Sequence, residues 1–354
     1  MDSGRPVVRR DLALLLVILV TAGWLRLLGV DWDQGKHLHP DERFLTMVAT
    51  DIRTPDSIGT YFDTSRSPLN PANVGRPFFV YGTLPLFLVR AVGEVTGQAG
   101  YDQIYLVGRV LSALFDLGTV ALTFWLGVLL AGPRAGLAGS ALVAFCVLSI
   151  QQAHFFTVDS AATCMTTLAL VMLVRAIRGG GWMSHLLFGI AFGLALSCRA
   201  NLAILSIPYA LALLYLWRAG RVRIASVVSM MAAAAIATFI VFRIFQPYAF
   251  VGPGFFGLAF SKDFLESAST IRALVTGAAD YPPSVQWIGR VRVLSAGLDL
   301  FLWGLGPAWG LLALIGLGWG LTRRRELDGT TVAAGRIVLL WAPLLFLFHA
   351  SQFA

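Results

Sequence analysis

Long apolar runs separated by short polar segments make up most of the sequence. The first extends from Leu12 to about Val30, and the others fall at about 104–131, 135–153, 159–177, 183–199, 201–217, 224–245, 301–321 and 335–353. A helix needs about 20 apolar residues to cross a hydrocarbon core of ~30 Å. The pattern therefore predicts an all-α polytopic membrane protein, with about nine transmembrane helices forming one transmembrane domain over residues 1–354. A cleaved signal peptide is disfavoured, because the first run is long and no clear small-x-small site follows it.

Two longer regions interrupt the apolar pattern, at 31–102 and 246–300, and we expect both to lie outside the membrane on the same face. The first contains an apolar segment from Phe78 to Val95 that carries Arg90 and the breakers Gly82 and Pro85. We interpret this segment as an interfacial or re-entrant helix, because a crossing there would move every later arginine-bearing loop to the other side. In the second region we expect surface helices around Lys262–Val275 and Ser284–Ser295.

Composition and charge support a membrane class. Hydrophobic residues make up 57% of the 354 residues and charged residues 13%, which excludes an ordinary soluble enzyme. The net charge of +8 follows from arginines beside the spans. Five arginine-bearing segments fall on one side, that of the N-terminus: Arg5, Arg9 and Arg10; Arg134; Arg175 and Arg178; Arg218, Arg221 and Arg223; and Arg323, Arg324 and Arg325. The positive-inside rule makes this side cytoplasmic. No feature supports nucleic-acid binding, and the three cysteines have no spacing typical of a disulfide framework or metal knuckle.

The first external region opens with HLHPDERFLTMVATDIR, residues 37–53. Pro40 is suited to the first turn of a helix, and apolar residues then recur at roughly helical spacing. Asp41 and Glu42 fall in that first turn. We predict a membrane-surface helix that presents two carboxylates at the mouth of the bundle. The alternative is that the pair only complements the N-terminal helix dipole.

Several ionisable residues lie towards the outer ends of spans, where such groups are costly and often mark sites. They are Arg109, Asp116, His154, Asp159, Arg199 and Arg243. Arginine is disfavoured on the outer side by the orientation rule, so arginines there call for an anionic ligand. Guanidinium groups match phosphate geometrically. We therefore predict that Arg109, Arg199 and Arg243 bind a phosphate-bearing substrate. We also place Asp159 and His154 in the substrate-binding site.

Each of these residues also has a structural interpretation. Arg109 could pair with Asp116 on the same helical face, and Asp159 could simply begin a helix after the turn QQAHFFTVDS. Arg199 could extend to the membrane surface, and Arg243, near the second external region, could be an interfacial anchor.

His37 and His39 alternate with Asp41 and could serve a divalent metal. The alternative is that both histidines are solvated in an exposed loop. A divalent cation is the one cofactor that the sequence raises as a candidate.

Five segments together resemble a known group of enzymes: HPDERF after the first span, GRVLSALFDLGTVAL, QQAHFFTVDS, GIAFGLALSCRAN and FQPYAF. They resemble the lipid-carrier-dependent glycosyltransferases of the GT-C superfamily, specifically family 39 and its protein-mannosyltransferase and aminoarabinose-transferase relatives. The resemblance extends to about Gly310. It implies a GT-C-like bundle with juxtamembrane helices in the external loops, in a bacterial or archaeal plasma membrane.

The resemblance also implies a reaction. The donor would be a sugar linked to polyprenyl or dolichyl phosphate, the acceptor a protein, lipid or glycan, and transfer would occur extracytoplasmically with inversion. Asp41 matches the loop carboxylate regarded as general base or acceptor-orienting group, with Glu42 beside it. Asp159 matches an acid that faces the same cavity. Arg199 falls where many relatives have a lysine that contacts the donor phosphate.

Two other function classes stay open. A multi-span transporter or lipid flippase would need a path that opens alternately to both faces, whereas a transferase predicts a cavity closed towards the cytoplasm. An assembly subunit could keep the fold without catalysis. The chain ends at Ala354 inside or just after an apolar segment, where relatives continue through further spans. We therefore expect either a C-terminally truncated chain or a short member.

Overall fold

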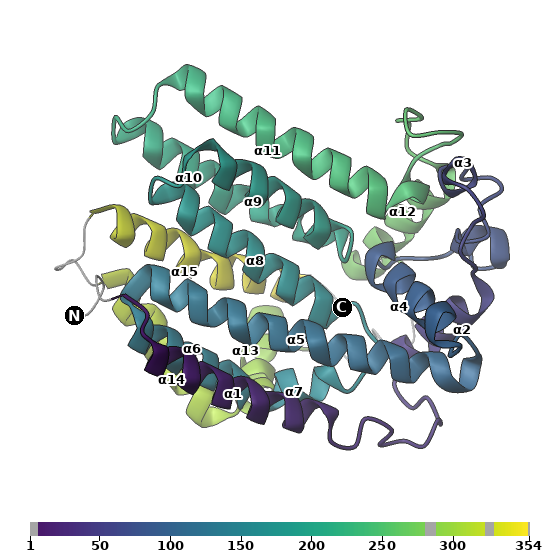
Figure 1. Cartoon of the computed structure of the whole chain (residues 1–354), viewed down its shortest axis with the longest axis horizontal. Coiled ribbons are helices and arrows are strands. Elements are labelled where there is room, and N and C mark those ends of the chain that lie inside the picture. The colour runs from purple at the N-terminus through teal and green to yellow at the C-terminus, as the bar shows by residue number, and fades with distance from the viewer. Residues whose placement is uncertain (1–5, 280–287, 323–328, 353–354) are drawn as a thin grey trace.

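The chain folds as a bundle of helices that run roughly side by side (Figure 1). The computed structural model describes residues 6–279, 288–322 and 329–352. The bundle helices are α1 (Arg9–Leu27), α5 (Tyr101–Ala131), α6 (Pro133–Ala144), α7 (Val147–Ala153), α8 (Asp159–Ile177), α9 (Gly181–Leu196), α10 (Ser206–Arg218), α11 (Ile224–Phe245), α14 (Pro307–Thr322) and α15 (Gly329–Ala350). The described residues form no named strand.

The apolar pattern predicted these elements well. Five helical segments in the described residues are long and apolar enough to cross a membrane, or six if α6 and α7 count as one broken span. The remaining predicted spans correspond to α1, α9 and α14. Of these, α9 and α14 are apolar helices of fewer than 18 residues. The prediction of an all-helical polytopic membrane protein is confirmed. Among the five long segments, α8 is the most enclosed, and it packs against α5, α9 and α15.

One predicted span is broken. Residues 135–153 were expected to form a continuous helix, but α6 and α7 meet at a bend of 60°. The Arg26 guanidinium donates hydrogen bonds to the carbonyls of Ala144 and Val143, at 2.9 and 3.3 Å. These carbonyls at the end of α6 would otherwise accept from the next helical turn. A side chain inserted at this point accounts for the break.

The first external region contains α2 (Pro40–Asp51), α3 (Ile58–Tyr61), the 3-10 turn η1 (Pro71–Val74) and α4 (Thr83–Thr96). With 14 residues, α4 is too short to span the hydrocarbon core. It packs against α2 and α5, where Leu86 and Val89 share a buried cluster with Leu45 and Val48 of α2. The interpretation of residues 78–95 as a helix that does not cross agrees with this packing.

The second external region contains the turn η3 (Pro247–Ala249) and α12 (Lys262–Thr276), which matches the first predicted surface helix. The second predicted surface helix was Ser284–Ser295, of which residues 284–287 lie outside the described residues. Over the rest, the prediction is wrong in position, because the helix begins only at Arg292. Helix α13 (Arg292–Asp299) continues through a π-helical turn (Leu300–Gly304) towards α14 and packs against α15. The Arg292 guanidinium donates to the Ser351 carbonyl at 3.3 Å. The apolar helix of the span predicted at 301–321, α14, begins at Pro307 rather than at 301.

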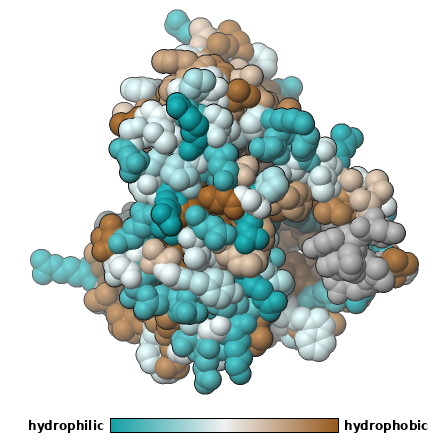
Figure 2. Space-filling view, turned by 90° about the vertical axis from the view of Figure 1, so that its right-hand side faces the viewer, coloured by the Kyte–Doolittle hydropathy of each residue, from teal (hydrophilic) through white to brown (hydrophobic). Residues whose placement is uncertain are grey.

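The two ends of the bundle differ. One end carries α2, α3, α4 and α12, and we call it the outer end (Figure 1). The N-terminus and the α10–α11 turn lie at the opposite, inner end, as the arginine pattern predicted (Figure 1). Arg5 and Arg323–Arg325 lie outside the described residues. Figure 2 shows the outer end face-on, with hydrophilic residues over much of it and hydrophobic residues between them. The membrane side of each end stays a prediction.

Candidate active site

A buried ion cluster fixes the start of α2. The Arg109 guanidinium on α5 donates to both carboxylate oxygens of Glu42, with 2.9 Å between Nε and Oε2, and its Nη2 donates to Asp33 at 2.9 Å. All three side chains are fully buried. The Phe156 backbone N–H also donates to Glu42, at 2.7 Å. The rings of Trp32 and Tyr105 lie 5.4 and 4.8 Å from the guanidinium carbon.

This cluster differs from two expectations, one for Glu42 and one for Arg109. Glu42 has both oxygens engaged inside the protein, so in this structure it does not face a cavity. The suggested pair of Arg109 and Asp116 is wrong, because Asp116 pairs with Arg26 instead. Burial alone would raise the pKa of the Asp33 carboxyl, but hydrogen bonds from Arg109 and Leu38 and the charge of Arg109 hold that pKa below its ordinary value.

Asp41 lies one residue away from Glu42 but belongs to a different environment. It is half-buried, and the Tyr81 hydroxyl hydrogen-bonds to its carboxylate. Burial raises the pKa of Tyr81, and the charge and hydrogen bond of Asp41 raise it further. Tyr81 also lies within electrostatic range of Arg199 and Asp159. Tyr81 thus connects the acidic turn of α2 with the outer ends of α8 and α9.

A close backbone contact places Tyr81. The N–H of Gly82 donates to the Cys198 carbonyl at 2.9 Å, and the N–H of Leu84 donates to the Ser197 carbonyl at 3.1 Å. A Cβ atom at Gly82 would lie 2.0 Å from the Ser197 oxygen, so only glycine permits this approach. The start of α4 is therefore joined to the segment that carries Arg199.

Arg199 and Asp159 form an ion pair across that segment. The Arg199 Nη2 lies 2.8 and 3.0 Å from the two carboxylate oxygens of Asp159, the first residue of α8. Both side chains are 34% exposed, so they face open space rather than the core. Within the part of the chain that the structure describes, the Arg199 Nε is buried without a hydrogen-bond partner. The guanidinium thus retains a donor for a further ligand.

The pair opens onto a pocket of about 440 Å³ between α5, α8, α15 and the 3-10 turn η2 (Ala200–Leu205). Its outer part holds Asp159, Arg199, Asn201 and His349, and the amide nitrogen of Asn201 lies 3.3 Å from the His349 Nε2. Threonines line one wall, and the inner part is apolar: Thr123, Thr163, Thr166 and Thr167; Leu126, Ala162, Leu170, Leu202, Trp341 and Leu345. A polar entrance above an apolar base suits an amphiphilic ligand.

Two polar atoms of this pocket lack partners. Among the described residues, the Thr166 hydroxyl and the Asn201 amide oxygen are buried without a hydrogen bond. Buried polar groups are rarely left unpaired, because each costs about 1–3 kcal/mol. A ligand with hydroxyl groups or a phosphate would satisfy them.

Two further predicted site residues lie elsewhere. His154 is held between backbone carbonyls, with Nδ1 2.8 Å from the Ile150 oxygen and Nε2 3.0 Å from the Leu28 oxygen. Arg243 is fully buried and donates to carbonyls of the loop that follows α11. Neither residue lines the pocket, and the full burial of Arg243 differs from the interfacial anchor that we considered for it.

The two histidines raised as metal ligands have different neighbours. His37 is buried with its ring centroid 4.6 and 4.7 Å from those of Tyr101 and Tyr105. His39 caps α2 by accepting from the Glu42 N–H at 3.4 Å, and it packs on Phe155. The described part of the chain contains no group of three His, Cys, Asp or Glu residues that could hold a metal ion.

Sequence reasoning missed four residues of the site: Tyr81, Thr166, Asn201 and His349. His349 was detectable, because it is an ionisable residue near the end of an apolar run. Thr163, Thr166 and Thr167 fall on one helical face of a span, which is also a readable signal. Tyr81 carried no signal, since its position depends on a backbone contact between distant segments.

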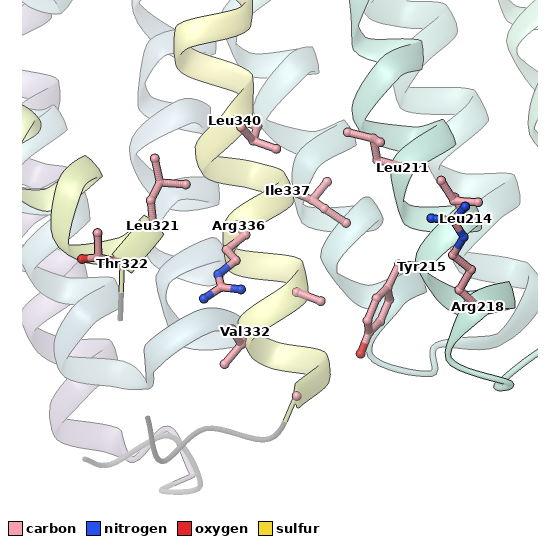
Figure 3. Close-up of a pocket in the computed structure, with 12 residues that line it drawn as sticks. Leu211, Leu214, Tyr215, Arg218, Leu321, Thr322, Val332, Arg336, Ile337 and Leu340 are labelled. Atoms are coloured by element: carbon pink, nitrogen blue, oxygen red, sulfur yellow. The ribbon is translucent and has the colours of Figure 1, made fainter. Parts of the chain in front are cut away.

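A larger hollow of about 1270 Å³ lies at the inner end between α10, α14 and α15 (Figure 3). Leu211, Leu214, Ile337 and Leu340 line it together with Arg218 and Arg336 (Figure 3). Among the described residues it shares no lining residue with the outer pocket. It also lies far from the carboxylates, so we place the candidate chemistry in the smaller pocket.

Comparison with known proteins identifies the fold. The family model described as dolichyl-phosphate-mannose-protein mannosyltransferase matches residues 84–244. No curated protein matches the sequence. The S. cerevisiae protein O-mannosyltransferase Pmt1-Pmt2 complex, solved with its sugar donor, is similar at 17% identity and a TM-score of 0.51, over 70% of this chain and 35% of that one.

The Archaeoglobus fulgidus oligosaccharyltransferase is similar over more of the chain. Its complex with Zn and sulfate aligns at 17% identity and a TM-score of 0.60, over 95% of this chain and 46% of that one. The same enzyme, AglB, bound to an inhibitory peptide and a dolichol-phosphate, aligns at 16% identity and a TM-score of 0.57, over 97% and 48%.

This chain therefore spans between about a third and a half of the length of these solved proteins. Both are GT-C superfamily members. The resemblance predicted from the motifs is confirmed: the chain has the fold of the GT-C membrane glycosyltransferases, and its segment 84–244 matches the protein-mannosyltransferase family.

Proposed function

We propose that this protein is a membrane glycosyltransferase that moves a sugar from a polyprenyl-phosphate-linked donor to an acceptor hydroxyl on the extracytoplasmic side. One observation carries the proposal. Tyr81 hydrogen-bonds to Asp41 and lies within electrostatic range of the Arg199–Asp159 pair, which lines a pocket that is polar at its outer part and apolar below. The sugar donor and the dolichol-phosphate in the two solved relatives support the same donor class.

The pocket fits the parts of such a donor in order. The phosphate would lie at Arg199, whose Nε and remaining N–H groups can bind its oxygens. The first prenyl units would follow the apolar side chains of Leu126, Leu170 and Leu345 into the bundle. The sugar would then face the outer side, within reach of the acceptor and of Asp41.

In the proposed reaction, the Asp41 carboxylate accepts the proton of the acceptor hydroxyl as its oxygen attacks the anomeric carbon. The bond between that carbon and the phosphate oxygen breaks, and its electrons stay on the polyprenyl phosphate. Arg199 stabilises the charge that develops there. Because the leaving group already carries charge, it needs no acid. Attack from the face opposite the phosphate inverts the anomeric configuration.

Two acidic residues then act as positioning residues rather than bases. Glu42 was predicted as catalytic beside Asp41, but its ion pair with Arg109 suits it to fixing the first turn of α2, and thereby the direction of Asp41. Asp159 suits the orientation of Arg199 through two contacts from one guanidinium nitrogen. The roles predicted for Arg109, Arg243 and His154 in substrate binding would likewise be indirect.

A transporter or flippase is the alternative function, and it needs a path through the bundle. The outer pocket and the inner hollow have separate linings in the described residues. Trp341, which lines the outer pocket, is buried in the core cluster of α8, α9, α10 and α15. This arrangement favours a cavity closed at the inner end, as the transferase predicts.

The test is turnover of a panel of labelled polyprenyl-phosphate sugars by purified protein in lipid nanodiscs, with candidate acceptors present. Asp41→Asn should bind the donor as the parent does but lose at least about 10²-fold in turnover, as expected for removal of a general base. Asp51→Asn, at the far end of the same helix, is the matched control and should retain activity. Donor binding without turnover by the parent, or full activity of Asp41→Asn, would contradict the proposal.

A further inference from the structure

A rigid hairpin follows α11 at the outer end. Phe250 and Phe260 form an isolated antiparallel bridge, and the Val251 N–H donates to the Ala259 carbonyl at 2.7 Å. The chain reverses between them through VGPGFFGLA. The Ser261 N–H then donates to the Ala249 carbonyl at 2.8 Å, which closes the base of the hairpin.

Buried contacts hold this hairpin in one conformation. The Arg243 guanidinium donates to the carbonyls of Phe255 and Gly254, at 2.9 and 2.7 Å. The Thr64 hydroxyl of the first external region donates to the Phe250 carbonyl at 2.6 Å. A Cβ atom at Gly252 would lie 2.6 Å from the Phe62 carbonyl oxygen, so the hairpin packs directly on the first external region. Its tip is thus presented by a fixed base.

The tip is apolar and exposed. Phe256 is 87% exposed, and Val251, Leu258 and Phe260 are about half exposed. Residues 250–260 contain no charged side chain, hydroxyl or side-chain amide. Exposing such side chains to water is unfavourable by ~25 cal/mol per Å² of apolar surface. An ordered exposed cluster of this kind marks an interaction surface.

Its position indicates the partner. The hairpin leaves the outer end of α11, a candidate span on which Ile236, Phe239 and Ile240 are exposed. In Figure 1 the loop between α11 and α12 extends away from the bundle, beyond the end of α11. The apolar surface of the hairpin therefore continues the lipid-facing surface of a span. Aromatic side chains are enriched at this level of membrane proteins.

We propose that this hairpin is a membrane anchor, which inserts Phe256 and its apolar neighbours into the headgroup region of the lipid leaflet around the outer end of α11. The absence of hydrogen-bonding side chains in 250–260 favours lipid over an acceptor or protein partner, whose recognition needs placed polar groups. Lys262, two residues after Phe260, has an 86% exposed side chain that is suited to contact the lipid headgroups. Because the hairpin base packs on Phe62 and Thr64, the anchor would hold both external regions at a fixed height over the membrane.

The inference does not depend on transferase activity, and it can be tested by spin labelling in nanodiscs. Cys146, Cys164 and Cys198 are buried, so a nitroxide should react selectively at a new surface cysteine. The labelled positions are Phe256→Cys and Leu258→Cys in the hairpin. Ile236→Cys provides the lipid-facing reference, and Arg66→Cys, whose native side chain is 81% exposed, provides the water-facing reference. The parent without a new cysteine is the labelling control.

The measurement is relaxation enhancement by oxygen, which concentrates in lipid, and by a polar nickel chelate, which stays in water. We expect both hairpin labels to show an oxygen-to-nickel accessibility ratio several-fold above that of Arg66→Cys and closer to that of Ile236→Cys. A ratio equal to that of Arg66→Cys would overturn the proposal. Shielding from both reagents would also overturn it, because it would indicate a protein contact. The second hairpin label keeps the test valid if Phe256→Cys does not fold.

Discussion

The sharpest prediction concerns Glu42→Gln, because Glu42 and the adjacent Asp41 are proposed to have different roles: Glu42 positions the helix and Asp41 acts as the base. Glu42 accepts three hydrogen bonds inside the protein: two from the Arg109 guanidinium and one from the Phe156 N–H at 2.7 Å. Glutamine keeps the size of the side chain. However, it removes the charge that neutralises Arg109 and turns one acceptor oxygen into a donor that faces other donors.

The size of the effect follows from this burial. Removing one partner of a buried ion pair costs about 3–5 kcal/mol. Asp33 still contacts Arg109 at 2.9 Å in the variant, so we expect the lower end, about 3 kcal/mol. This is about a 10²-fold shift in the ratio of folded to unfolded protein. Asp41→Asn should change stability by less than about 1 kcal/mol, since the asparagine carbonyl can still accept the Tyr81 hydroxyl.

The assay measures stability and activity separately. Denaturant titration of each purified variant in the same lipid gives the change in the free energy of unfolding, and turnover is normalised to folded protein. We expect Glu42→Gln to be less stable but to keep most of its turnover per folded molecule. We expect Asp41→Asn to have the stability of the parent and to lose turnover. The reverse pattern, with a stable but inactive Glu42→Gln, would refute the division of roles argued here.

Three further predictions address the rest of the site. Gly82→Ala should lower both thermal stability and turnover, because its Cβ would lie 2.0 Å from the Ser197 oxygen; a parent-like melting temperature would contradict the close approach. Arg199→Lys should raise the KM for the donor about tenfold, because lysine keeps the charge but not the fork that contacts both Asp159 and a phosphate; an unchanged KM would remove Arg199 from the donor site. Stability measured by denaturant titration should fall as the pH drops below about 4, the ordinary value for an aspartate. The folded pKa of Asp33 is depressed, so its contribution is present above the unfolded pKa and is lost as the pH falls through the folded pKa. Asp33→Asn should flatten that loss, and an identical pH profile would contradict it.

The spans were predictable because hydrophobicity along one segment largely decides whether that segment enters the membrane. The break between α6 and α7 was not predictable by the same reasoning. Its cause is Arg26, which is 118 residues away from the Ala144 carbonyl that it binds. In the sequence Arg26 appears only as a charge that interrupts the end of the first apolar run.

Ion-pair partners show the same limit. Arg109 and Asp116 lie on one face of α5, so local spacing suggested that they pair. The structure pairs each with a residue from another segment, Glu42 for Arg109 and Arg26 for Asp116. Helical spacing states which side chains could meet, whereas the packing of distant segments decides which do. Asp159 and Arg199 were each recognised as site candidates, but their contact with one another depends on the packing of α8 against α9.

The division between Asp41 and Glu42 follows from helix geometry. Successive residues on an α-helix point about 100° apart, since there are 3.6 per turn, so neighbours in sequence cannot share one environment. We expected both carboxylates at the mouth of the bundle, but this spacing turns one acid of the pair inward when the other faces the pocket. Glu42 is the acid that turns inward, because it forms a fully buried ion pair with Arg109. This pair sets the rotation of α2 about its axis. Asp41 then has to point towards Tyr81. The buried acid thus determines where the proposed base lies, which is why substitutions at two adjacent carboxylates should fail in different ways.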